Sequence, residues 1–88
     1  MKKVFIQLWS WEGNPAGASL HINEQGFKKW SKSNSEMNFN GELTEIEISK
    51  SLFFELLYND GILELKQNSL SNLISLGEIK IEENWNVA

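Results

Sequence analysis

Three kinds of side chain in this 88-residue sequence could do chemistry: one histidine, a series of glutamates and four tryptophans. Acid–base or nucleophilic catalysis needs cooperating groups, and the chain has no cysteine and only one histidine, His21. His21 alternates with Leu20 and Ile22, as a residue of a β-strand does. Glu45 and Glu47 form a carboxylate pair, but neighbouring glutamates are common on exposed strands. We therefore predict no catalytic residue and no enzymatic activity.

The sequence contains no glycine-rich phosphate loop and no metal-ligand spacing, so we predict no cofactor and no metal site. Lys28, Lys29, Trp30 and Lys32 mix positive charge with an aromatic ring, as single-strand nucleic-acid sites do. Three lysines at the end of a helix are equally expected from the helix dipole. Every basic residue is lysine, whereas bidentate recognition of bases and phosphates is typical of arginine. Nucleic-acid binding is therefore not predicted.

The glutamates give the strongest functional signal. If the strands near residues 42–48, 62–66 and 78–83 share one sheet with their aliphatic side chains inward, the outward face carries a row of five acids. These are Glu45, Glu47, Glu64, Glu78 and Glu82. Only Lys66 and Lys80 share that face, and such a field would attract a basic partner. The alternative is an ordinary solvated surface that keeps the protein in solution.

The aromatic residues are candidates for interface anchors. Burying one tryptophan removes roughly 150 to 250 Å² from water, so at least one of Trp9 and Trp11 is expected in the core. Trp11 lies beside a turn and is expected to reach the surface, where it could anchor a partner. Tyr58 and Trp85 are the other aromatic anchors that we predict. Recognition of a sugar would require exposed tryptophans to form a flat aromatic platform.

Hydrophobic alternation predicts the elements that position these residues. Residues 3–11 form a strand that is apolar on both faces and therefore lies inside the sheet. A long loop with several turn formers joins it to a strand at residues 19–22. Asn23 as a cap, and lysines toward the far end, favour a helix rather than a hairpin at residues 24–32.

The second half of the chain repeats a helix and strand pattern. Asn40-Gly41 predicts a type I′ turn between a brief strand near Phe39 and a strand at residues 42–48. Further strands are expected at residues 62–66 and 78–83. A short helix or turn at residues 68–77 separates them.

A helix beginning after Ser49 or Ser51 is expected to end at Asn59-Asp60-Gly61. Its apolar residues cover much of its circumference. We predict a buried stripe of Leu52, Phe53, Leu56 and Leu57. Phe54 and Tyr58 form a second apolar edge that needs either more protein or a partner to cover it.

These elements predict one domain over residues 1–88 with an α+β fold in two layers: a mainly antiparallel sheet with two or three short helices on one face. Net charge is +3 over residues 1–32 and −7 over residues 33–88. Met1-Lys2-Lys3 and the apolar run after them imitate a secretory leader, but Gln7 and Glu12 interrupt it. No run approaches the roughly 20 apolar residues that cross a bilayer. We expect a cytoplasmic protein without a membrane partner.

An acidic chain that opens "MKKVFIQLW", continues "LHINEQGFKKW" and ends in glutamate-rich helix and strand units resembles the small bacterial immunity proteins, which neutralise a cognate toxin. The resemblance implies a non-enzymatic inhibitor that binds a basic, nuclease-like toxin. In this hypothesis the glutamates steer and hold the partner. The alternative is a structural or scaffold subunit that forms a homodimer or larger homo-oligomer through Phe54 and Tyr58.

Overall fold

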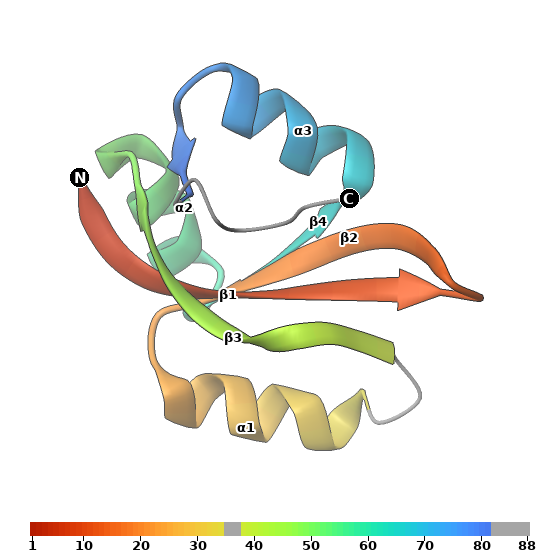
Figure 1. The fold of residues 1–88 in the computed structure, drawn as a ribbon. Helices are drawn as coiled ribbons and strands as arrows, with labels where there is room; N and C mark the ends of the chain where they lie inside the picture. The colour runs from red at the N-terminus through yellow and green to blue at the C-terminus, as the bar shows by residue number, and fades with distance from the viewer. Residues whose placement is uncertain (35–37, 82–88) are drawn as a thin grey trace.

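The computed structural model describes residues 1–34 and 38–81. Five strands form one antiparallel sheet in the order β4-β2-β1-β3-β5, with three short helices packed against it (Figure 1). The strands are β1 (Lys2–Trp11), β2 (Asn14–His21), β3 (Asn38–Ile48), β4 (Ile62–Lys66) and β5 (Ile79–Lys80). The helices are α1 (Glu24–Ser33), α2 (Lys50–Tyr58) and α3 (Gln67–Ser75).

The aliphatic core lies between the sheet and the helices α2 and α3. Val4 and Ile6 of β1 have no solvent exposure and point to this side, together with the inward residues of the other strands. The helices contribute Leu52, Leu56 and Leu70, which are also buried. Because successive residues of a strand point to opposite faces, one alternating set fills this core and the other set faces away.

Helix α1 covers the opposite face of the sheet (Figure 1). Its Trp30 is only 7% exposed and packs beside Trp9 of β1, with 6.1 Å between the ring centroids. Trp9 and Val4 belong to opposite alternating sets of β1, so α1 and the aliphatic core lie on different sides of the strand. The prediction that β1 lies inside the sheet is therefore confirmed.

The α+β class that the sequence predicts is confirmed, with a mainly antiparallel sheet and two short helices, α2 and α3, on one face. Both helix caps predicted from the sequence are also present. The Asn23 side chain accepts a hydrogen bond from the Gly26 amide at 2.7 Å, and the Ser49 hydroxyl accepts one from the Leu52 amide at 3.1 Å. Each cap satisfies an amide that the helix itself leaves unpaired.

The first hairpin is tighter than predicted. Its turn consists of Glu12 and Gly13, both with positive φ as a type I′ turn requires, and Trp11 pairs directly with Asn14. The predicted long loop is therefore wrong. Pro15 is tolerated within β2 because the pairing of β2 with β4 begins only at Gly17. The N–H that proline lacks is therefore not needed for a hydrogen bond to β4.

The predicted turn at Asn40-Gly41 is also wrong. Both residues lie within β3, which pairs with β1 from Lys2 to Ser10. Ile6 of β1 pairs with Thr44, but Leu8, two residues later, pairs with Asn40. Residues 41–43 of β3 lie between these two pairs and form an irregularity in the ladder. Pairing with a long buried strand outweighs the local preference of Asn-Gly for a turn.

Gly17 marks a close approach of β2 and β4 that a substitution can test. A Cβ atom at Gly17 would lie 2.1 Å from the Leu65 carbonyl oxygen, and the φ angle of Gly17 is +148°. Because this oxygen belongs to the paired backbone, it cannot move aside as a side chain could. We expect Gly17→Ala to lower the free energy of unfolding by about 3 kcal/mol.

Gly13→Ala is the matched control, since Gly13 also has positive φ but has no atom within 4 Å of the added Cβ. We expect it to cost about 1 kcal/mol. Urea unfolding followed by tryptophan fluorescence gives both values. Equal losses in the two variants would contradict the crowding at Gly17.

Candidate functional site

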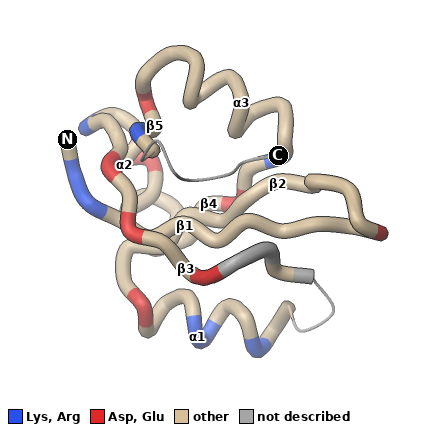
Figure 2. The backbone as a smooth tube through the Cα atoms, in the orientation of Figure 1, with Lys and Arg blue, Asp and Glu red and all other residues tan. Residues whose placement is uncertain are grey.

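The predicted row of five glutamates does not form one panel. Glu45 and Glu47 on β3 and Glu64 on β4 do share the sheet face opposite the aliphatic core, as alternation predicts. However, β2 and β1 lie between β4 and β3 in the strand order. The acids on β3 and the acid on β4 are thus separated by the two central strands, as the red segments of the tube in Figure 2 show. The expectation of one continuous acidic face is therefore wrong.

Lysines accompany the glutamates of β3. The Lys3 ammonium lies 3.9 Å from the Glu45 carboxylate, and both side chains are largely exposed. Glu47 lies between Lys3 on β1 and Lys80 on β5 in the strand pairing. These lysines reduce the negative field at this end of the sheet, although an exposed pair at this distance contributes little stability.

Glu64 and Glu78 have structural partners. The Trp30 indole N–H donates to the Glu64 carboxylate at 3.1 Å, which fastens α1 to the edge strand β4. The Ser49 hydroxyl donates to the Glu78 carboxylate while it caps α2. Both carboxylates therefore stabilise packing of the fold. Glu82 lies outside the described residues.

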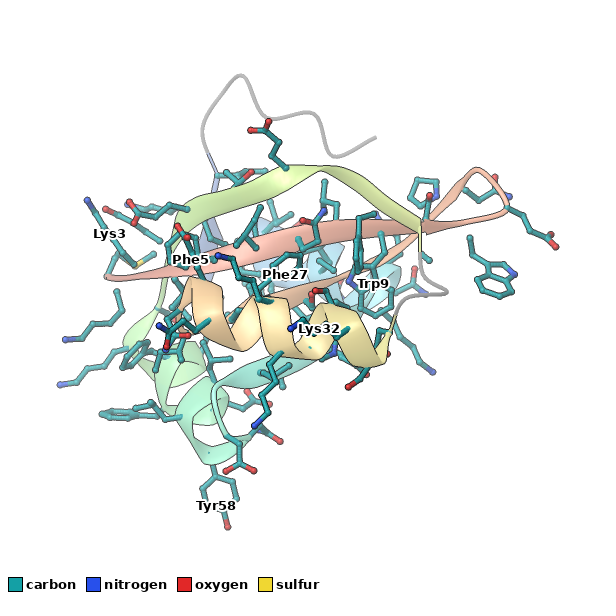
Figure 3. All side chains as sticks on the ribbon, turned by 90° about the horizontal axis from the view of Figure 1, so that it is seen from below. Lys3, Phe5, Trp9, Phe27, Lys32 and Tyr58 are labelled. Carbon is teal, nitrogen blue, oxygen red and sulfur yellow. The ribbon has the colours of Figure 1, made fainter. Side chains whose placement is uncertain are left out.

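An aromatic cluster fills the space between the two acidic edges. It consists of Trp9, His21, Phe27, Trp30 and Phe39. The ring centroid of His21 is 5.1 Å from that of Phe27 and 5.2 Å from that of Trp30, in edge-to-face arrangements. Figure 3 shows Phe27 and Trp9 between α1 and the sheet. Trp30 therefore packs inward and is not free to stack on a nucleic-acid base.

His21 is a buried structural residue. Its Nε2 atom lies 2.7 Å from the Ser19 hydroxyl, and neither side chain has any solvent exposure. A serine and histidine at this distance resemble the pair used by nucleophilic hydrolases, but a substrate could not reach them. The His21 Nδ1 atom has no hydrogen-bond partner among the described residues. Burial lowers the pKa of His21 from 6.5 to about 4, so the imidazole is neutral at pH 7.

Three exposed apolar side chains lie together on α2, and we call Phe54, Leu57 and Tyr58 the α2 surface. Their side chains are 57%, 45% and 92% exposed. Tyr58 projects from the end of the helix (Figure 3). The second apolar edge predicted at Phe54 and Tyr58 is not covered by the described residues. The prediction that Leu57 is buried is wrong. Leu57 follows Phe54 by three residues and therefore shares its side of the helix, a spacing that could have identified it.

Two acids that the sequence analysis did not single out flank the α2 surface. Glu55 lies on α2 beside Phe54, and Asp60 follows the helix with a φ of 59°; both side chains are exposed. The Lys50 ammonium lies 5.9 Å from the Phe54 ring centroid, within the range of a cation–π contact. The surface thus combines exposed apolar groups with two carboxylates and one ammonium.

A hollow of about 320 Å³ adjoins the α2 surface between α2 and α3. Its lining is apolar at the floor and polar at the rim. The lining residues are Leu52, Glu55, Leu63, Leu65, Ser69, Asn72 and Leu73. Glu55 lines this hollow and follows Phe54 on α2, so it lies between the hollow and the α2 surface.

The remaining predicted anchors do not join the α2 surface. Trp11 is 59% exposed, as predicted, but it lies next to the β1–β2 turn. That turn and α2 are at opposite ends of the molecule in both views (Figures 1 and 3). Trp85 lies outside the described residues. Trp11 and Tyr58 therefore belong to different surfaces.

Within residues 1–34 and 38–81, no group of three or more histidine, cysteine or acidic side chains could hold a metal ion. None of the helices in this part of the chain is long and apolar enough to cross a membrane. Comparison of the chain with protein-family models, with curated proteins and with solved structures finds no match.

The pKa of His21 predicts how stability depends on pH. The imidazole has a pKa of about 4 in the folded protein and 6.5 as its ordinary value, so between these values the unfolded chain binds more protons. The stabilisation is complete above pH 6.5 and is lost as pH falls toward 4, a total of about 3 kcal/mol.

Urea unfolding of the wild-type protein between pH 7 and 4.5 measures this loss. His21→Asn is the control because asparagine does not titrate, and we expect its stability to change much less over the same range. A wild-type stability that stays constant from pH 6.5 to 4.5 would contradict the role assigned to His21.

Proposed function

We propose that this protein is a non-enzymatic inhibitor that binds a basic protein partner through the α2 surface. The observation that supports this most is the exposure of Phe54, Leu57 and Tyr58 on one side of a nine-residue helix. Tyrosine and other aromatic residues dominate the binding energy of interfaces when a partner desolvates them. A fully exposed aromatic side chain has roughly 150 to 250 Å² of surface to bury. Tyr58 at 92% exposure retains nearly all of its surface for a partner, and Phe54 at 57% retains somewhat more than half.

The charges around the α2 surface support a basic partner. Glu55 and Asp60 are exposed beside the apolar groups, and the whole chain has a net charge of −4. Lysine or arginine side chains of a partner could pair with these carboxylates at the rim, which accelerates association and selects the partner. The ring of Phe54 already attracts the Lys50 ammonium, so it also suits a cation.

The hollow between α2 and α3 offers a side-chain binding site near this surface. Its floor includes Leu63 and Leu65 of β4 and Leu73 of α3, and its rim includes Glu55. An aliphatic side chain of the partner fits such a lining, and a neighbouring cation of the partner would reach Glu55. A central apolar contact within a polar rim is the usual anatomy of a specific interface.

In this proposal the protein is an immunity protein that neutralises a basic, nuclease-like toxin in the cytoplasm. The chain carries no cysteine, so it folds without disulfides, which is compatible with the reducing cytoplasm of this proposal. Inhibition would follow from occupation of a basic surface on the toxin by the α2 surface. The glutamates of the sheet would contribute to the long-range field, while direct contact would be made by α2.

The second candidate is a homodimer through the same surface. Lys50 is the first residue of α2, and Asp60 follows its last residue by two positions. Two copies of α2 packed antiparallel would bring Lys50 of one copy near Asp60 of the other. The apolar groups of both copies would then cover each other at the centre.

Alanine substitution of both aromatic residues tests the proposal. We expect Phe54→Ala/Tyr58→Ala to leave folding intact, because both side chains are exposed, and to weaken partner binding by about 2 kcal/mol or more. Wild type and variants are used as baits in extracts of the cells that make this protein. The captured protein is then purified for calorimetry at low and high salt and for inhibition of its activity.

Leu76→Ala is the matched control because Leu76 is also an exposed apolar residue, at the end of α3. The expected partner is basic, binds wild type and the control, binds less tightly as salt increases, and loses activity in the complex. Equal capture by the double variant would contradict the proposal. A dimer that depends on concentration but not on salt, and that the double variant abolishes, would establish the second candidate instead.

A further inference from the structure

Helix α1 is held to the sheet by a small set of contacts. Phe27 and Trp30 are its two apolar residues, and both pack toward the strands, where the Trp30 indole also donates to Glu64. The helices α2 and α3 pack on the opposite face around the aliphatic core, so movement of α1 would leave that core covered (Figure 1). An element with few buried contacts can open at a smaller free energy than the whole fold.

The imidazole of His21 lies between the sheet and these two aromatic rings. Its ring centroid is 5.1 Å from that of Phe27 and 5.2 Å from that of Trp30, and the side chain has no solvent exposure. The backbone at His21 is fixed, because it pairs with Phe5 of β1 on one side and with Ile62 of β4 on the other. Water therefore reaches the imidazole most readily when α1 moves away.

The site of His21 provides no acceptor for a second imidazole proton. The Nε2 atom lies 2.7 Å from the Ser19 hydroxyl, while Nδ1 has no hydrogen-bond partner among the described residues. A neutral imidazole carries one N–H, which the Ser19 hydroxyl can accept, whereas the protonated form carries two. A buried cation with an unpaired N–H is destabilising, and burial accordingly lowers the pKa of His21 to about 4.

The charged groups on the elements around His21 lie at the margins of this space. They are Lys3 on β1, Glu45 on β3, Glu64 and Lys66 on β4, and Glu24 and Lys28 on α1, and all six side chains are exposed. None of them is a hydrogen-bond partner of the imidazole. Glu64 nevertheless accepts from Trp30, so a test must separate titration of Glu64 from titration of His21.

We propose that α1 is an acid-released cover: protonation of His21 detaches this helix while the sheet, α2 and α3 stay folded. A helix of ten residues is too short to persist alone in water, so α1 loses its structure when it detaches. Its departure uncovers Trp9 and Phe39, which pack against its aromatic rings. Acid thus exposes an aromatic surface that is hidden at neutral pH. This device does not depend on the function proposed for the α2 surface.

Amide hydrogen exchange between pH 6.5 and 4.5 tests the proposal. Once α1 is detached, His21 has its ordinary pKa of 6.5, so detachment takes up a proton over this range. We expect protection factors of the central α1 amides to fall by up to about tenfold per pH unit and to lie below those of β1 and α2 throughout. His21 is the sole histidine in the sequence, so its C–H resonances report the charge of the imidazole in the same samples.

Two variants assign the response to His21. We expect His21→Asn to keep the protection of α1 nearly constant over this range, because asparagine does not titrate. Glu64→Gln keeps an oxygen acceptor for the Trp30 indole but does not titrate either, and it should respond to pH as wild type does. The proposal is overturned if α1 and β1 share one protection factor, if the imidazole gains its proton while α1 stays protected, or if Glu64→Gln abolishes the response.

Discussion

Burial of β1 on both faces is the constraint on which the rest of the molecule depends. Val4 and Ile6 have no solvent exposure on the side of α2 and α3, while Trp9 packs against Trp30 of α1 on the other side. A strand with apolar side chains on both faces must have cover on both. This requirement fixes β1 between β2 and β3 and distributes the helices to opposite sides of the sheet.

The same constraint explains why the acids of the sheet stay apart. Once β1 and β2 occupy the middle, the space between Glu45 on β3 and Glu64 on β4 belongs to the aromatic cluster under α1. Glu64 then becomes a hydrogen-bond acceptor for Trp30, which joins α1 to the sheet edge. Exposed apolar groups remain at the periphery of the described residues, on α2, where Phe54, Leu57 and Tyr58 are uncovered.

Local signals in the sequence predicted the elements well, because each has a local physical cause. Asn23 and Ser49 cap helices through amides three residues away, and the two apolar faces of residues 3–11 identify a central strand. The strand order could not be obtained in this way, since it depends on contacts between segments distant in the chain. Sequence reasoning therefore predicted correctly that Glu45 and Glu64 lie on the same face of the sheet. It predicted wrongly that their strands are neighbours.

Asn40-Gly41 and Leu57 show the same limit. Asn40-Gly41 is a strong turn signal, yet pairing with the long strand β1 keeps both residues within β3. Leu57 belongs to an apolar run, and only the positions of the other elements decide which side of α2 stays uncovered. The candidate site was thus predictable as far as Phe54 and Tyr58, whose spacing is local. Glu55 and Asp60 became candidates only once the uncovered side of α2 was known.

The contact between Trp9 and Trp30 provides a spectroscopic signal for the packing of α1 against the sheet. The two indoles belong to β1 and α1, and their centroids are 6.1 Å apart with planes inclined by 39°. Electronic transitions of two tilted chromophores at this separation couple, which produces paired circular dichroism bands of opposite sign. Separation of α1 from the sheet would remove the coupling even while the sheet itself persisted. Docking of this one helix can therefore be observed independently of the melting of the rest of the fold.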